Sequence, residues 1–296
     1  MRQRHGIIAA FSSCLLASIG TAPPAWAVSD AGVGVVAEYR PAAGRYTFTR
    51  GTGGAPVPVR IGTVVQAGDR VTLPAGASVT VHLANGEASD FKGPGTFAVP
   101  DARPLGKLAS IFKSIPALFD DEYRLAGTAA SRGGGKCAEP GQAVQPIAVP
   151  ILAPGARVVA GERDLPLAWR GGCEPFVVKV LSGTRSLVHR ESIDGRQVRL
   201  DDVPLAPGSY TILITDSTGL RHESSLEAVS EGPALPAEVA ADTSPLGVIA
   251  QAVWYAEQDG GRWRLESFER LRPLIRAGDP LAGTLGDGVL WGTTTN

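Results

Sequence analysis

The chain has 296 residues, and its 28 basic and 29 acidic side chains give a formal net charge of −1. This balance, without any basic stripe, argues against nucleic acid as a partner. The 23 prolines and 37 glycines separate short runs rich in Val, Leu, Ile and Thr, a pattern typical of strands joined by turns. We therefore expect a mainly β protein.

The first 27 residues have the three parts of a secretory signal peptide. Arg2 and Arg4 form a basic start, residues 6–20 are apolar, and residues 25–27 (AWA) are a cleavage box. A retained membrane anchor is the weaker alternative, because the apolar run falls short of the roughly 20 residues that cross a bilayer. Cleavage would leave 296 − 27 = 269 residues. We expect a periplasmic or secreted protein that does not span the membrane and has about two domains.

Residues 28–100 are expected to form an antiparallel β domain. Alternating or apolar runs predict strands at 33–39, 45–49, 57–61, 71–73, 78–83, 87–91 and 96–99. Asn85-Gly86 lies between two of these runs and is the strongest short-range hairpin signal, because both residues tolerate a positive φ. Short connections favour antiparallel pairing.

Residues 101–144 are expected to form one helix and a flexible linker. Apolar residues at spacings of three and four predict a helix over 105–119, and the small, polar residues 126–142 predict a linker.

The cysteines that remain after cleavage are Cys137 and Cys173. In an oxidising compartment we expect them to form one structural disulfide, and two free thiols are the alternative.

Residues 145–230 hold seven short strand-like runs, which predict a β-sandwich. Residues 231–296 are expected to be a helical hairpin and a loose tail. Ser244-Pro245 is an N-cap followed by proline at the first helical position, and it opens a helix to about Gln258. A second helix is predicted over 263–277, and the tail from Gly283 onward is expected to lack structure.

Groups that carry catalysis are sparse in this sequence, and we expect no enzyme, no cofactor and no metal centre. The histidines of the mature chain, His82, His189 and His222, each stand alone, whereas a metal site needs clustered ligands. No G-x-S-x-G is present, and the Gly-rich run before Lys136 fails the phosphate-loop pattern. The acidic runs 120–122 and 201–202 lack the spacing of a calcium loop.

Residues 57–100 resemble the FecR domain. The resemblance rests on Ala67-Gly68-Asp69, the strand 78–83 with its Asn85-Gly86 turn, and Gly93-Pro94-Gly95. It implies a small envelope-side β domain found in signalling and surface proteins and not known for catalysis. FecR-type regulators place a cytoplasmic segment and a membrane helix before this domain, whereas a cleavable signal stands here. The anti-sigma role is therefore not carried over.

The second β region resembles an immunoglobulin or fibronectin type III sandwich. The resemblance is carried by residues 165–169 (LPLAW) and 205–210 (LAPGSY), and it implies that Trp169 and Tyr210 are core and corner residues. The C-terminal pair of helices is similar to a single tetratricopeptide-like hairpin. One such unit cannot bury its own apolar face, so it must dock on the sandwich or on a partner.

The aromatic residues of the C-terminal helices are candidate interface anchors, because aromatic side chains dominate interface energetics. These candidates are Trp254, Tyr255, Trp263 and Phe268. The alternative is that they pack within the chain.

The sequence thus favours a non-enzymatic FecR-domain protein of the cell envelope that acts as an interaction, signalling or scaffold module. Its partner would be an envelope protein or a surface polymer. One alternative is a glycan- or cell-wall-binding protein or hydrolase whose acids, such as Asp120, Asp121 and Glu122, gather in a pocket with residues of the sandwich. Another is a purely structural component of an exported assembly.

Overall fold

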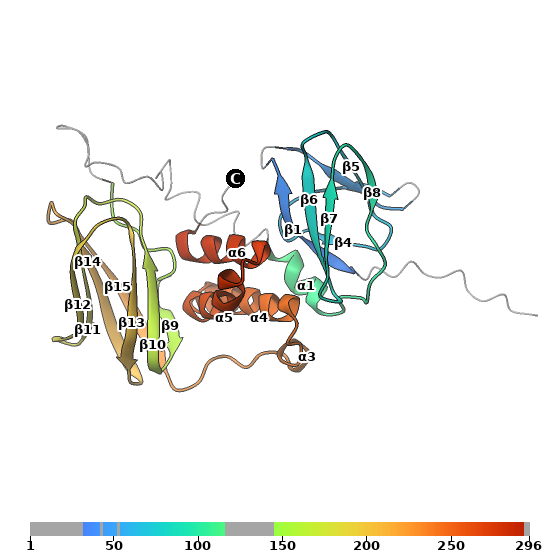
Figure 1. Cartoon of the computed structure of the whole chain (residues 1–296). Helices are drawn as coiled ribbons and strands as arrows, with labels where there is room; N and C mark the ends of the chain where they lie inside the picture. Colours follow the sequence, from blue (N-terminus) through green and yellow to red (C-terminus); the bar gives the residue numbers. More distant parts are fainter. Residues whose placement is uncertain (1–31, 42–43, 52–53, 116–144, 293–296) are drawn as a thin grey trace, which may run out of the picture. The chain divides into compact units, whose positions relative to one another are not determined.

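A computed structural model describes residues 32–41, 44–51, 54–115 and 145–292 of the chain (Figure 1). The described residues are mainly β, with helices gathered at the C-terminal end. None of the described helices is long and apolar enough to cross a bilayer.

The first β region contains eight strands in two four-stranded antiparallel sheets, ordered β4-β1-β6-β7 and β3-β2-β5-β8. The strands are β1 (Gly34–Arg40), β2 (Thr47–Thr49), β3 (Pro56–Pro58), β4 (Val64–Val65), β5 (Arg70–Leu73), β6 (Ser78–Leu83), β7 (Ala88–Lys92) and β8 (Gly95–Ala98). Alternate residues of β6, namely Val79, Val81 and Leu83, face a buried core. The expected antiparallel pairing is confirmed, but the strands divide between two sheets.

Two turns fix the register of this region. The hairpin predicted at Asn85-Gly86 joins β6 to β7, and Gly86 has a φ of 89°. The N–H of Gly86 donates to the carbonyl of Leu83 at 2.9 Å, and its positive φ explains why glycine suits this position. Before β5, the buried carboxylate of Asp69 accepts the N–H of Gln66 at 2.8 Å. Burial raises the pKa of Asp69, and this hydrogen bond partly offsets the effect.

Helix α1 (Leu108–Lys113) follows the first β region. It is shorter than the predicted helix 105–119, of which the part after residue 115 lies outside the described residues, as does the predicted linker 126–142. The apolar stripe itself is confirmed, since Leu105, Leu108, Phe112 and Ile115 are buried.

The second β region contains the seven predicted strands. They are β9 (Ala156–Val159), β10 (Gly161–Ala168), β11 (Phe176–Ser182), β12 (Arg185–Ile193), β13 (Gln197–Leu205), β14 (Gly208–Thr215) and β15 (Arg221–Val229). A five-stranded sheet, β12-β11-β14-β15-β9, faces the β10-β13 pair, and their inner faces share one apolar core. Pairing is antiparallel except between β15 and β9. This is the β-sandwich architecture of immunoglobulin-like domains.

Two predicted landmarks of the sandwich lie where expected. Trp169 is fully buried and packs edge-on against Phe176, with ring centroids 5.1 Å apart. Tyr210 lies near the start of β14, and its hydroxyl donates to the carbonyl of Ala206 at 2.7 Å. A tyrosine at this corner that bonds backbone a few residues upstream is a hallmark of immunoglobulin-like sandwiches.

The C-terminal region is a group of helices rather than a two-helix hairpin. The helices are α3 (Ala237–Ala240), α4 (Pro245–Glu257), the 3-10 turn η1 (Gln258–Gly260), α5 (Arg264–Arg276) and α6 (Pro280–Trp291). The predicted cap is confirmed, because the hydroxyl of Ser244 accepts the N–H of Gly247 at 3.1 Å.

The expectation of a loose tail from Gly283 onward is wrong, because α6 runs through it. Asp279 caps this helix by accepting the N–H of Ala282 at 2.8 Å, and Leu281 and Leu285 are buried four residues apart. A Cβ added at Gly286 would lie 2.5 Å from Cδ1 of Ile275 in α5. The absence of a side chain at Gly286 therefore allows α6 to approach α5 closely.

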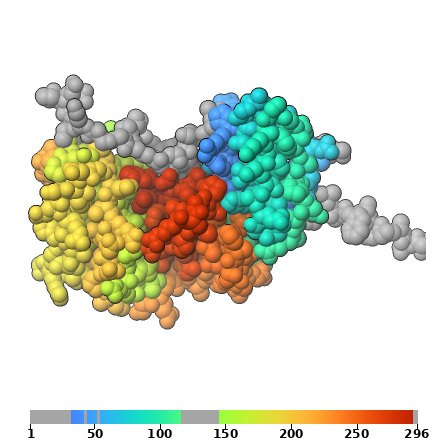
Figure 2. Space-filling view, in the orientation of Figure 1, coloured from blue at the N-terminus to red at the C-terminus, as the bar shows by residue number. Residues whose placement is uncertain are grey.

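The helices share buried apolar clusters with residues of both β regions; Figures 1 and 2 colour these segments by residue number. Ala256, Leu265 and Val289 join the core of the sandwich. On the other side, Val35 and Ala37 of β1 share a cluster with residues of α1, α4, α5 and α6. The helical unit thus packs within the chain, against the sandwich as one of the two expected alternatives had it, and also against the first β region.

Candidate functional site

Two consecutive turns interrupt the chain just before β9. The N–H of Leu152 donates to the carbonyl of Val149 at 3.0 Å, and that of Ala156 donates to Ala153 at 2.9 Å. Pro150 and Pro154 take the second position of these turns, which proline favours. Gly155 has a φ of 72°, as the third position of a type II turn requires. Strand β9 therefore cannot extend backward beyond Ala156.

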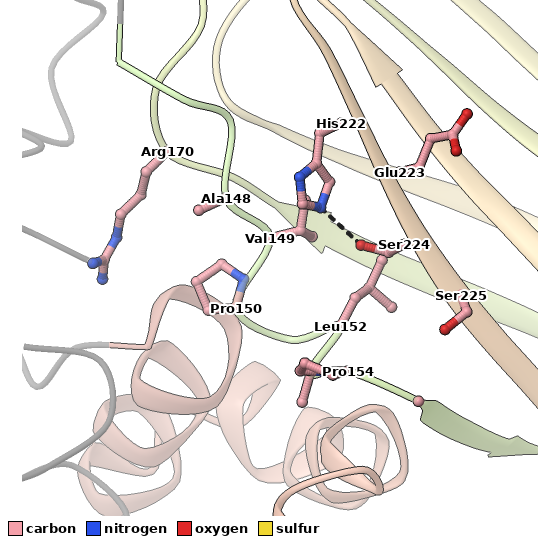
Figure 3. A pocket seen from close by; sticks show the side chains of 12 residues that line it. Ala148, Val149, Pro150, Leu152, Pro154, Arg170, His222, Glu223, Ser224 and Ser225 are labelled. Carbon is pink, nitrogen blue, oxygen red and sulfur yellow. Dashed lines mark hydrogen bonds between the residues drawn. The ribbon is translucent and has the colours of Figure 1, made fainter. Parts of the chain in front are cut away.

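A pocket of about 410 Å³ lies between this segment and the start of β15 (Figure 3). Its wall is mainly apolar, with polar groups contributed by β15 and by Arg170, which follows β10. The lining residues are Ala148, Val149, Pro150, Leu152, Ala153, Pro154, Gly155, Arg170, His222, Glu223, Ser224 and Ser225. Small-molecule and side-chain sites commonly combine an apolar wall with a few placed polar groups.

His222 and Ser224 project from the same face of β15, because side chains alternate along a strand. The ring Nε2 of His222 lies 2.8 Å from the hydroxyl of Ser224, as Figure 3 shows. Burial lowers the pKa of His222, and a hydrogen bond to the backbone of Ile147 partly opposes this effect. Burial therefore favours the neutral form of the imidazole at the centre of the pocket.

The charged residues of the lining are engaged elsewhere. Arg170 donates to the backbone carbonyl of Trp291, and its guanidinium points away from His222 in Figure 3. Glu223 accepts from Arg221 at 2.6 Å. Neither charge is directed at the centre of the pocket, which suits an uncharged ligand.

No group of three or more His, Cys, Asp or Glu capable of holding a metal occurs in the described parts of the chain. His82 lies 3.6 Å from Asp279, the cap of α6, and His189 lies 3.0 Å from Glu191. The three histidines are thus far from forming one cluster. Of the acidic runs, Asp201 pairs with Arg199 at 2.7 Å, and residues 120–122 lie outside the described residues.

The predicted interface aromatics lie within the helical region, and two of them are buried. Tyr255 and Trp263 are 7% and 3% exposed, and their ring centroids are 6.5 Å apart. Trp254 and Phe268 are partly buried, and Phe268 packs against the sandwich core. For Tyr255 and Trp263 the structure favours the alternative of packing within the chain.

Cys173 is buried beside a polar loop of the sandwich. Its backbone N–H donates to Asp216 at 2.8 Å. Burial raises the pKa of Asp216, but hydrogen bonds from Thr218, Cys173 and Leu220 outweigh it, so that the pKa is lowered. The expected partner, Cys137, lies outside the described residues, so the disulfide stays a prediction.

Sequence reasoning missed the pocket and identified only one of its residues, His222, as a residue of interest. The prolines and the glycine of residues 150–155 (PILAPG) were the available signal, because they predict that the chain turns where a strand neighbour would otherwise continue.

The sequence matches no protein-family model and no curated protein. Among solved structures, the crystal structure of CopC from Methylosinus trichosporium OB3b is 22% identical with a TM-score of 0.22, covering 28% of this chain and 91% of that one. The fibronectin(III)-like modules of CbhA from Clostridium thermocellum are 10% identical with a TM-score of 0.21, covering 70% and 86%. Both scores are low, so the sandwich assignment rests on the strand pairing itself.

Proposed function

We propose that this chain is an exported, non-enzymatic protein that binds a protein partner of the cell envelope at the pocket beside β15. The observation that carries the proposal is the pocket itself, a preformed hollow of about 410 Å³ with a mainly apolar wall. Its central polar residues, His222 and Ser224, lie within hydrogen-bond distance of each other, and its charged residues Arg170 and Glu223 interact with other groups. Such a site offers shape and hydrogen bonds rather than a set of reacting groups.

The sequence supports the cellular setting of this proposal. Residues 1–27 have the pattern of a cleavable secretory signal, which would deliver the chain to the envelope. We also propose that residues 57–100 are a FecR-like domain, on the motifs from Ala67 to Gly95. In the structure the Gly68-Asp69 pair of that motif forms the turn before β5, a structural role that fits an interaction domain.

The test is site-specific photocrosslinking in intact cells that produce the full chain. A benzoylphenylalanine replaces Pro154, an exposed residue of the pocket lining, and a matched control carries it at the exposed Thr184 between β11 and β12. We expect a discrete protein adduct from position 154 and none from position 184. Equal labelling at both positions, or none at either, would contradict the proposal. A glycan adduct at position 154 would favour the polymer-binding alternative.

A further inference from the structure

The start of β15 has an open edge, here meaning the side of residues 221–225 that faces away from β14. Strand β15 pairs with β14 from Arg221 to Ala228, whereas its pairing with β9 begins only at Leu226. The turns at residues 149–156 draw the chain away from this edge. Residues 221–225 of β15 therefore have a neighbouring strand on one side only.

The backbone groups at the open edge can be assigned from the ladder. The carbonyl of Val229 accepts the N–H of Ala160 at 2.8 Å, so Val229 directs its backbone groups toward the β9 side. Because these directions alternate along a strand, Ser225 and Glu223 direct their N–H and C=O groups to the same side. Among the described residues, no backbone hydrogen bond joins either residue to the segment 148–155.

We infer that the partner at this site is an extended polypeptide segment that adds as a strand to the open edge of β15 and places one apolar side chain in the pocket. The inference rests on the proposed function and names the chemistry of its partner. A row of alternating donors and acceptors is complementary to another extended backbone. Five residues of a strand span about 17 Å, which sets the length of the contact.

The pocket explains why the added segment would carry an apolar side chain. Side chains of an added strand alternate between the two faces of the sheet, and those on the face of His222 and Ser224 meet the wall formed by Val149 and Leu152. A charged side chain placed there would lose its hydration without gaining an opposite charge, because Arg170 and Glu223 are engaged elsewhere.

The experiment compares three forms of the full chain, each carrying the photocrosslinker at position 154: unchanged Ser225, Ser225→Ala and Ser225→Pro. Proline removes the outward N–H and places its ring on the open edge, yet it leaves the hydrogen bonds to β14 in place, because proline is tolerated at strand edges. We expect Ser225→Ala to keep the adduct and Ser225→Pro to lose it by about tenfold or more.

The outcomes separate the two proposals. No adduct with Ser225 unchanged would overturn both. An adduct that survives Ser225→Pro, or a glycan in its place, would overturn strand addition and leave a binding pocket. The far-ultraviolet circular dichroism and thermal midpoint of Ser225→Pro must match those of Ser225→Ala, so that loss of the adduct is not loss of the fold.

Hydrogen exchange of the unmodified full chain tests the edge without any substitution. We expect the amides of Glu223 and Ser225 to exchange at least about a hundredfold faster than those of Ser224 and Leu226, which bond to β14. Equal protection of all four amides would show that the edge is already paired, and would overturn the inference.

Discussion

Removing the carboxylate of Glu266 should loosen the helical region from the sandwich. Glu266 is a buried residue of α5 whose Oε1 accepts the backbone N–H of Val159 in β9 at 2.8 Å. The same oxygen lies 2.8 Å from the guanidinium of Arg163 in β10. One carboxylate thus holds a helix, a strand backbone and a cation together, and Glu266→Ala leaves two donors without their acceptor.

The expected loss follows from these contacts. Hydrogen bonds to a charged group contribute about 1.5–3 kcal/mol each, but Arg163 keeps partial access to water, with 19% of its side chain exposed, and so recovers part of the loss. We expect the free energy of unfolding to fall by about 2–3 kcal/mol in Glu266→Ala. For a chain of this size, about 2 °C is lost per kcal/mol, so the thermal midpoint should fall by about 4–6 °C. Glu266→Gln should lose about 1 kcal/mol, because the amide oxygen can still accept from Val159.

Urea and thermal unfolding, followed by circular dichroism, measure both quantities. The matched control is Glu162→Ala in β10, an exposed glutamate for which no ion pair occurs within the described residues. It should change the free energy by less than about 0.5 kcal/mol. If Glu266→Ala were no more costly than this control, the carboxylate would not join the helix to the sandwich in the way described.

Three further outcomes follow from single side chains. Asp216→Asn should lower stability by about 2 kcal/mol in urea unfolding, since it weakens a carboxylate that accepts several hydrogen bonds; an unchanged midpoint would contradict this. Tyr210→Phe should lower the free energy of unfolding by about 1 kcal/mol, because it loses the hydrogen bond to Ala206. An unchanged free energy would show that this hydrogen bond does not stabilise the sandwich. Because burial lowers the pKa of His222, the unfolded chain binds a proton first as the pH falls below about 6.5. The free energy of unfolding should therefore decline from that pH down through the pKa of the folded state, and the decline should be smaller in His222→Gln. The same pH dependence in both proteins would contradict this prediction.

Local patterns predicted most of the strands, because the order of apolar and polar residues within a strand reflects which of its faces is buried. Alternation in residues 78–83 marks one face of β6, and residues 205–210 carry the corner that Tyr210 forms. Both signals lie within a few residues, where period and turn chemistry act. The division of the first β region between two sheets was beyond that range, because it depends on β5 pairing with β2 and β8 rather than with β6.

The candidate site could not be read from the sequence, because its two walls lie about 70 residues apart. The turns of residues 149–156 become meaningful only once β15 is known to lie beside them. Helix α6 was missed for a different reason. Its glycines lower intrinsic helix propensity, and only the structure shows that Gly286 is needed for the close approach to Ile275.

The two buried faces of β1 bear on the order in which the chain can complete its structure. Val36 faces the core of the first β region, while Val35 and Ala37 face the cluster formed with the C-terminal helices. Those helices are synthesised last, roughly 200 residues after β1. During synthesis one apolar face of β1 therefore stays uncovered until these helices form, a condition that exposes chains to aggregation. Contacts of such long sequence separation also slow folding, so this protein should depend on holding chaperones until its last helix has emerged.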